Sequence, residues 1–270
     1  MSSEGEIRHE LAVVTGASSG IGLALARQFA EHGFDLVVAA EDDAIRSAAR
    51  DLQQEFEVEV EAVQCDLATE AGVEDLAQRL AGRDVDAIAI NAGIGSGGDF
   101  RETDLRQELR LVDLNCRSTV HLAKRVIPAM AERGRGRVLF TSSIAALTPS
   151  PFEAVYGASK AFVASFSQAL RNELKDTGVT VTALMPGPTE TEFFRRAGME
   201  DTKLGAQAKD DPNDVARQGF DALMAGKDHV VAGAMKNRVQ ATLTRVISDE
   251  TKAELHRAES EPGSAEKVKR

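Results

Sequence analysis

A glycine-rich turn directly after the first buried strand constrains the fold of this chain more than any other feature. The apolar run Leu11–Thr15 predicts a strand, and the sequence Thr15-Gly16-Ala17-Ser18-Ser19-Gly20-Ile21-Gly22 leads from it into an amphipathic helix over Ile21–His32. The first glycine permits the tight turn, the second lets the backbone approach a pyrophosphate, and the third lets helix and strand pack closely. Free N–H groups at the positive end of the helix then face the phosphates. The turn therefore predicts a dinucleotide-binding fold.

The rest of the chain alternates buried strands with amphipathic helices. The expected later strands cover Leu36–Ala40, Val58–Gln64, Val85–Ile90, Arg137–Thr141, Val179–Leu184 and the short His229–Ala232. The expected helices cover about Ala44–Phe56, Gly72–Leu80, Leu105–Ala131, Ala154–Lys175 and Asp214–Ala225. Strands separated by helices pair in parallel through right-handed crossovers. The pattern predicts the α/β class, with a single Rossmann-type, doubly wound parallel sheet covered by helices on both faces. It spans residues 10–250, after an N-terminal extension of residues 1–9.

The composition suits one such domain and disfavours several kinds of partner. The chain has 270 residues, of which 43% are hydrophobic, which is enough to fill one large core. Its net charge of −11 repels phosphate backbones and anionic membrane surfaces, so neither nucleic acid nor a membrane is an expected partner. The polar N-terminus lacks a signal-peptide pattern, and no run approaches the roughly 20 apolar residues of a membrane span.

The cysteines and histidines favour a reducing compartment and no metal. Cys65 and Cys116 are far apart and lack metal-ligand spacing, so we expect them to be unpaired thiols of a cytoplasmic protein. The five histidines form no pair with ligand spacing, and no metal site is expected.

The single tyrosine of the chain stands four residues before a lysine. Tyr156 and Lys160 share one helix face at this spacing, which places an ammonium beside the phenol. A phenol ionises near pH 10, and a neighbouring positive charge is expected to lower its pKa, making Tyr156 a usable general acid/base. Ser143 follows the strand that ends at Thr141 and is placed to hold a carbonyl oxygen. Asn115 lies within the long helix and is also open to a simpler interpretation, a hydrogen bond in the core.

Together these motifs resemble the short-chain dehydrogenase/reductase family over about residues 10–190. That family carries a T-G-x-x-x-G-x-G turn, an N-A-G turn beside the central sheet, an acidic residue after the third strand, and a P-G turn after the sixth. The positions matched to cofactor binding are Gly16, Ser18, Ser19, Gly20, Ile21, Gly22, Glu41, Asp66, Leu67, Asn91, Ala92, Gly93, Tyr156, Lys160, Pro186, Gly187, Thr189 and Thr191. The catalytic tetrad carries over as Asn115, Ser143, Tyr156 and Lys160.

The resemblance implies an oxidoreductase that moves a hydride between a nicotinamide dinucleotide and a carbonyl or secondary alcohol. Tyr156 then exchanges the proton of the substrate oxygen, and Lys160 lowers the tyrosine pKa and binds the nicotinamide ribose. Ser143 positions the substrate oxygen, and Asn115 holds a water of the proton relay. The resemblance also implies a homodimer or homotetramer, paired through the two long helices.

The run after the second strand, Ala39-Ala40-Glu41-Asp42-Asp43, matches neither cofactor pattern of the family. NAD-using members often carry Asp where this chain has Ala40, and NADP-using members often carry Arg where it has Glu41. A carboxylate here accepts hydrogen bonds from a free ribose 2′-OH and repels a 2′-phosphate. NAD is therefore the expected cofactor and NADP the alternative, for which Arg46, one helical turn onward, is the candidate phosphate ligand.

The strand–helix pattern loosens after Thr189. Residues 190–211 are expected to form a substrate lid, in which Phe193, Phe194 and Met199 suggest apolar walls for a small, apolar substrate. Residues 251–270 are polar and charged, and they are expected to be a disordered tail. The part beyond about Arg257 is expected to be dispensable for fold and chemistry.

Two other functions stay open on the same fold. A non-catalytic dinucleotide sensor or scaffold would be expected to lack Tyr156 or Lys160, and both are present. A nucleotide-sugar epimerase would be longer, with a substrate domain after the sheet and a different glycine spacing.

Overall fold

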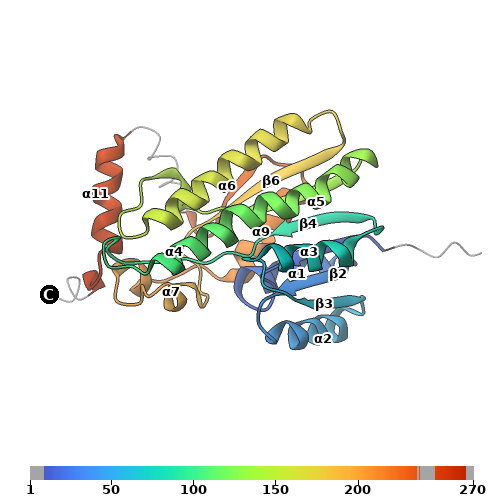
Figure 1. Cartoon of the computed structure of the whole chain (residues 1–270), viewed down its shortest axis with the longest axis horizontal. Coiled ribbons are helices and arrows are strands. Elements are labelled where there is room, and N and C mark those ends of the chain that lie inside the picture. Colours follow the sequence, from blue (N-terminus) through green and yellow to red (C-terminus); the bar gives the residue numbers. More distant parts are fainter. Residues whose placement is uncertain (1–8, 236, 238–246, 266–270) are drawn as a thin grey trace, which may run out of the picture.

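A parallel sheet forms the centre of the molecule in the computed structural model, which describes residues 9–235, 237 and 247–265 (Figure 1). Its seven strands in the described chain are β1 (Leu11–Thr15), β2 (Asp35–Ala40), β3 (Val60–Gln64), β4 (Val85–Ile90), β5 (Gly136–Thr141), β6 (Val179–Pro186) and β7 (His229–Ala232). They lie in the order β3-β2-β1-β4-β5-β6-β7, and every pairing is parallel. The predicted doubly wound α/β sheet is confirmed.

Helices cover both faces of this sheet (Figure 1). The main ones are α1 (Gly20–Glu31), α2 (Ala44–Phe56), α3 (Glu70–Leu80), α4 (Leu105–Val112), α5 (Ser118–Glu132), α6 (Ala154–Glu173) and α9 (Pro212–Met224). One apolar core lies between the sheet and α1, α2 and α9, and a second lies between the sheet and α3, α5 and α6. Because side chains alternate along a strand, Val14 of β1 enters the first core and Val13 enters the second.

The strand order reverses between β1 and β4, which are neighbours in the sheet. Connections on either side of this point leave in opposite directions, which opens a crevice beyond the carboxyl ends of the strands. The glycine turn after β1 and the Asn91-Ala92-Gly93 turn after β4 both lie at this point.

The long helix predicted over about Leu105–Ala131 is interrupted. Between α4 and α5, residues Asp113–Arg117 form a π-helical segment that contains Asn115. A π segment adds a residue to one turn, and such segments occur often at functional sites. The hydrophobic periodicity of the sequence does not reveal this local change.

The predicted disordered tail is wrong for residues 251–265. Helix α11 (Asp249–Ser260) begins at Ser248, whose hydroxyl accepts a hydrogen bond from the N–H of Thr251. Polar side chains of the kind that suggested disorder have protein partners here. For example, the Ser260 hydroxyl donates a hydrogen bond to the Glu153 carboxylate at 3.1 Å. Residues 266–270 of this tail, and residues 1–8 of the predicted N-terminal extension, lie outside the described residues. In the described chain, every helix is too short or too polar to cross a membrane.

Candidate active site

A cavity of about 420 Å³ opens at the carboxyl ends of the strands. Its volume falls in the range of sites that bind small molecules and cofactors. All the residues predicted to bind the cofactor line this cavity, and so do Ser143, Tyr156 and Lys160. Of the predicted site residues, only Asn115 is absent from the lining.

The glycine turn has no room for side chains at its three glycines. Gly16 and Gly20 have φ values of +67° and +56°, which L side chains rarely adopt. A Cβ atom on Gly22 would lie 2.0 Å from the carbonyl oxygen of Gly16. The turn therefore requires glycine at these positions, and it brings the start of α1 to the edge of the cavity.

The Asn91-Ala92-Gly93 turn is tied to both neighbouring strands. The Thr15 hydroxyl of β1 accepts hydrogen bonds from the N–H groups of Asn91 and Ala92, at 2.9 and 3.0 Å. The Asn91 amide donates to the Thr15 carbonyl, and its oxygen accepts from the Thr141 hydroxyl of β5, both at 3.0 Å. These bonds fix the floor of the crevice across β1, β4 and β5.

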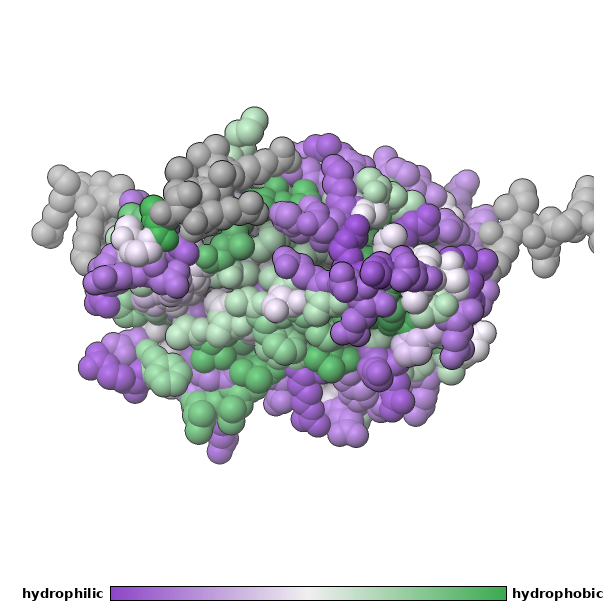
Figure 2. Space-filling view, turned by 90° about the horizontal axis from the view of Figure 1, so that it is seen from above, coloured by the Kyte–Doolittle hydropathy of each residue, from purple (hydrophilic) through white to green (hydrophobic). Residues whose placement is uncertain are grey.

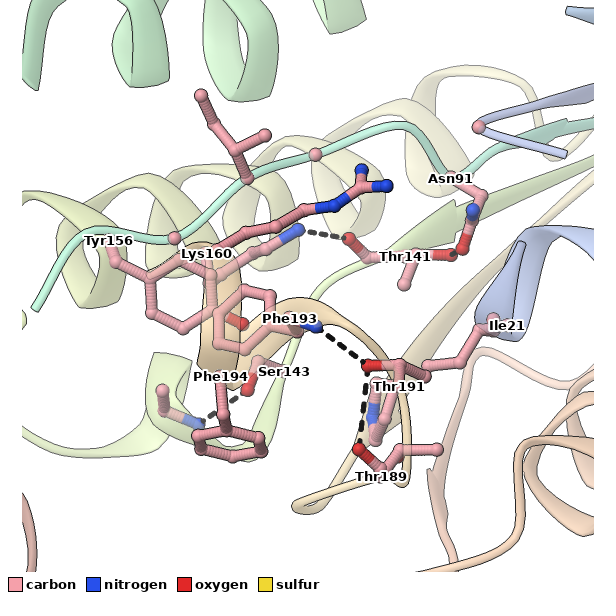
Figure 3. A pocket seen from close by; sticks show the side chains of 18 of the residues that line it. Ile21, Asn91, Thr141, Ser143, Tyr156, Lys160, Thr189, Thr191, Phe193 and Phe194 are labelled. Carbon is pink, nitrogen blue, oxygen red and sulfur yellow. Dashed lines mark hydrogen bonds between the residues drawn. The ribbon is translucent and has the colours of Figure 1, made fainter. Parts of the chain in front are cut away.

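Three buried polar side chains meet on the other side of the cavity (Figure 3). Tyr156 and Lys160 come from the first two turns of α6, and Ser143 comes from the segment after β5. The Lys160 ammonium donates to the Thr141 carbonyl at 3.0 Å and lies 5.8 Å from the centre of the Tyr156 ring. Ser143 accepts a hydrogen bond from the N–H of Ala145 at 3.1 Å, which holds its hydroxyl at the start of a short 3-10 turn.

Burial changes the protonation of this group in a direction that the sequence did not suggest. Burial raises the pKa of Tyr156 well above its ordinary value, although a hydrogen bond with Ser143 acts to lower it. Burial also lowers the pKa of Lys160 to about 8. The net lowering of the tyrosine pKa that the sequence suggested is therefore not found, because burial has the larger effect. The Tyr156 phenol is protonated at neutral pH, which is the form that donates a proton.

Asn115 makes the core hydrogen bonds of the simpler interpretation. Its side-chain oxygen accepts from the N–H of Ile94 at 3.0 Å, and its amide donates to the Ile94 carbonyl and the Ser159 hydroxyl at 2.9 and 3.0 Å. The carbonyl of Asn115 accepts from the Thr119 hydroxyl at 2.8 Å. Asn115 thus ties the segment after β4 to α6, and its part in a water relay stays a prediction.

Known proteins share both the sequence and this geometry. A family model described as short chain dehydrogenase matches residues 10–201. The chain belongs to the short-chain dehydrogenase/reductase family. An uncharacterized short-chain type dehydrogenase/reductase of Sinorhizobium fredii is 37% identical over 205 residues, which cover 73% of this chain and 77% of the relative. Sulfoacetaldehyde reductase 2 of Chromohalobacter salexigens is 35% identical over 68% of this chain and 74% of its own.

Solved structures agree in fold. A short-chain dehydrogenase from Sphingobium yanoikuyae in complex with NADPH superposes with a TM-score of 0.79 at 28% identity, and the match covers 88% of this chain and 96% of that one. This short-chain dehydrogenase/reductase is therefore an oxidoreductase whose relatives act on alcohols and carbonyls and whose structural neighbours bind nicotinamide dinucleotides.

Charged side chains of this short-chain dehydrogenase gather at the end of the cavity formed by the segments that follow β2 and β3. Arg110 of α4 donates to Glu41 at 2.6 Å and to Asp66 at 3.0 Å. Burial acts to raise the pKa of Asp66, but hydrogen bonds from Arg110 and from a backbone N–H hold it below its ordinary value. Asp42 accepts from the Ser18 hydroxyl at 2.9 Å. The sequence did not indicate Arg110 as a partner of Asp66, because 44 residues separate the two.

Arg46, the candidate ligand for a 2′-phosphate, has other partners in the structure. Its guanidinium pairs with Asp43 at 2.8 Å and donates to Gln64 at 3.1 Å.

The predicted lid lies over Tyr156. It contains the short helices α7 (Phe193–Arg196) and α8 (Lys203–Ala206), and Thr189 pairs with Asp210 across its base. The ring of Phe193 lies 5.1 Å from that of Tyr156, centre to centre (Figure 3). A Cβ atom on Gly95 would lie 2.3 Å from the Phe193 ring, so the glycine makes room for it.

Two further lining residues come from places that the sequence did not indicate. Glu153 precedes α6, and His256 belongs to α11. His256 lies in the predicted tail, so sequence reasoning placed it away from the cavity. The feature of the sequence that could have pointed to Glu153 as a lining residue is its position three residues before Tyr156.

Proposed function

We propose that the protein transfers a hydride between a nicotinamide dinucleotide and a carbonyl or secondary alcohol carbon, with Tyr156 as the general acid/base. The observation that carries this proposal is the joint burial of Tyr156, Ser143 and Lys160 beside the glycine turn, in one cavity. Family membership supports the reaction class, and the geometry supports the role of each side chain.

The residues fit a dinucleotide. The turn at Gly16, Gly20 and Gly22 leaves a hollow at the start of α1, where backbone N–H groups suit phosphate oxygens. Pro186, Gly187, Thr189 and Thr191 line the opposite side and would hold the nicotinamide half. When bound there, the dinucleotide supplies or takes the hydride.

Three side chains would handle the substrate oxygen. The protonated phenol of Tyr156 donates to a carbonyl oxygen as that oxygen gains negative charge. The Ser143 hydroxyl donates a second hydrogen bond to the same oxygen and fixes its position. The Lys160 ammonium, held by the Thr141 carbonyl, stabilises a phenolate once the proton has left. In alcohol oxidation each step runs in reverse.

NAD(H) is the preferred cofactor in this proposal. Glu41 and Asp42 put two carboxylates at the cavity wall after β2, where an adenosine ribose would lie. Carboxylates accept bonds from a 2′-OH and repel a 2′-phosphate. The NADPH complex of the Sphingobium neighbour describes that protein's cofactor.

The substrate is a small, mainly apolar carbonyl compound or alcohol. The side chains that support this are the apolar ones of the cavity near Tyr156, namely Ile94, Ala145, Leu147, Phe193, Phe194 and Leu204.

The protein would work as a homodimer or homotetramer in the cytoplasm. Apolar side chains remain exposed along the outer side of α4, α5 and α6, namely Leu105, Leu109, Val112, Val120 and Phe162. Seen from above, apolar residues gather in a band between hydrophilic margins (Figure 2). Pairing of these helices with a second copy would cover them. The unpaired thiols of Cys65 and Cys116 accord with a reducing compartment.

The test is to mix the purified protein with NADH or NADPH and a panel of small apolar ketones, and to follow the loss of reduced nicotinamide absorbance. We expect at least one ketone to oxidise NADH in a protein-dependent manner. If neither dinucleotide binds, as measured by nicotinamide fluorescence, the proposed function is wrong.

A further inference from the structure

A buried carboxylate joins the catalytic helix to the C-terminal helix. Glu153, the residue before α6, is 3% exposed. Its carboxylate accepts from the His256 ring nitrogen Nε2 at 3.0 Å and from the Ser260 hydroxyl at 3.1 Å, both on α11. Ser260 and His256 also contact each other at 3.1 Å. More than 100 residues separate the two sides of this cluster, so it is a tertiary contact and not a local helix cap.

The same carboxylate stands beside the catalytic tyrosine. Glu153 directly precedes α6, Tyr156 lies in the first turn of that helix, and both residues line the cavity. After burial, which has the larger effect, the charge of Glu153 adds to the rise in the Tyr156 pKa. A negative charge near a phenol opposes its ionisation.

The C-terminal helix reaches the cavity and the lid as well. His256 and Glu259 of α11 line the cavity together with Tyr156. Beyond α11, the N–H of Gly263 donates to the Asp201 carboxylate at 2.9 Å, and Ser264 accepts from the N–H of Lys203 at 2.8 Å. Asp201 and Lys203 belong to the predicted lid, so residues 249–265 contact both walls of the substrate end.

We infer that Glu153 is a positioning residue for proton transfer: its buried carboxylate, fixed by His256 and Ser260, holds α11 as a wall of the substrate cleft and places a negative charge near the Tyr156 phenol. The inference rests on the proposed role of Tyr156. It predicts that carbonyl reduction keeps its proton donor to a higher pH than it would without Glu153.

Other charged groups line the same cavity as the phenol and are left unchanged by the test. They are Lys160 on α6, Glu192 and Arg196 in the lid, and His256 and Glu259 on α11, all of which line the cavity. Arg257 stacks over Phe152 at 5.0 Å, next to Glu153 in the sequence.

The electrostatic part can be tested without substrate or cofactor. The chain has one tyrosine and no tryptophan, so tyrosinate absorbance reports Tyr156 alone. We expect Glu153→Gln to lower the tyrosine pKa by about one unit, which gives about tenfold more tyrosinate at the same alkaline pH. The matched control, Glu254→Gln, removes the same charge from an exposed position of α11 and should leave the absorbance unchanged. Equal titration of the Glu153→Gln and wild-type proteins, both folded by circular dichroism, would overturn this part.

The anchoring part is tested by hydrogen exchange, with Glu153 itself intact. His256→Ala and Ser260→Ala should speed exchange of the amides in residues 249–265, because the helix loses its buried partner. Leu255→Ala, at a side chain that is 59% exposed, should not. Unchanged protection in the His256→Ala protein would contradict the anchor. Neither readout uses turnover, so a failure here is distinct from a failure of the proposed reaction.

Discussion

The Arg110 guanidinium of α4 donates to the Glu41 carboxylate after β2 at 2.6 Å, and Glu41 lines the cavity. In the proposed function Glu41 would repel a 2′-phosphate, and it is also an ion-pair partner of the nearby Arg110. The side chains of Glu41 and Arg110 are 51% and 42% exposed, so this ion pair contributes little to the free energy of unfolding. Its consequence is for cofactor choice.

Glu41→Gln should shift cofactor preference toward NADP(H). The substitution removes a repulsive charge and takes away one of the two carboxylate partners of Arg110, whose pair with Asp66 remains, and both effects act in the same direction. We expect the ratio of kcat/KM for NADPH to that for NADH to rise by about tenfold, or about 1.4 kcal/mol. Asp51→Asn is the control, because Asp51 is an exposed carboxylate of α2 that does not line the cavity. A wild-type enzyme that already prefers NADPH tenfold would refute the proposed NAD preference.

Lys160 should leave a signature in the pH dependence of stability. Its folded pKa of about 8 lies below the ordinary 10.5, so the unfolded chain binds more protons between these values. The free energy of unfolding must then rise with pH in this window. From about pH 8 to about pH 10, the wild type should gain about 2 kcal/mol relative to Lys160→Met. Urea unfolding of the cofactor-free proteins measures this difference, and a constant difference would show that the ammonium is not buried.

The exposed apolar side chains of α4, α5 and α6 should form an interface between copies. Phe162 is 42% exposed on α6, and Phe162→Asp would place a charge in the predicted contact. We expect light scattering to give a multiple of 28.9 kDa for the wild type and a lower mass for the variant. Met224→Asp on α9, over the other face of the sheet, is the control. A wild-type monomer at micromolar concentration would contradict this prediction.

Removal of Ser248–Arg270 should destabilise the protein. The truncation exposes Glu153 and removes the partners of Asp201 and Lys203. We expect the melting temperature to fall by several degrees, since about 2 kcal/mol corresponds to roughly 4–8 °C for a domain of this size. An unchanged melting temperature would restore the original expectation of a dispensable tail.

The sequence predicted the sheet and the polar residues at its edge because both depend on local patterns. Short apolar runs between amphipathic stretches locate β1 through β7. Helix geometry places Tyr156 and Lys160, which are four residues apart, on one face. The π segment at Asn115 escaped because one inserted residue hardly changes the hydrophobic pattern. Helix α11 escaped because its stabilising partner, Glu153, is about 100 residues away.

The protonation of the site also lies beyond local patterns. Spacing places Lys160 beside Tyr156, but the degree of burial decides which charged form each group disfavours. Burial depends on the lid, on α11 and on the sheet at once, and no short motif contains that information.

The role of Tyr156 as the proton donor is tested most directly by the rate at which Tyr156→Phe oxidises NADH with a ketone that the wild type reduces. Phenylalanine keeps the ring that contacts Phe193 and removes only the hydroxyl. We expect kcat to fall by about 10²–10⁴-fold, while the NADH dissociation constant stays within a few-fold of the wild-type value. Retention of more than about a tenth of the wild-type kcat would contradict the role of Tyr156 as the proton donor.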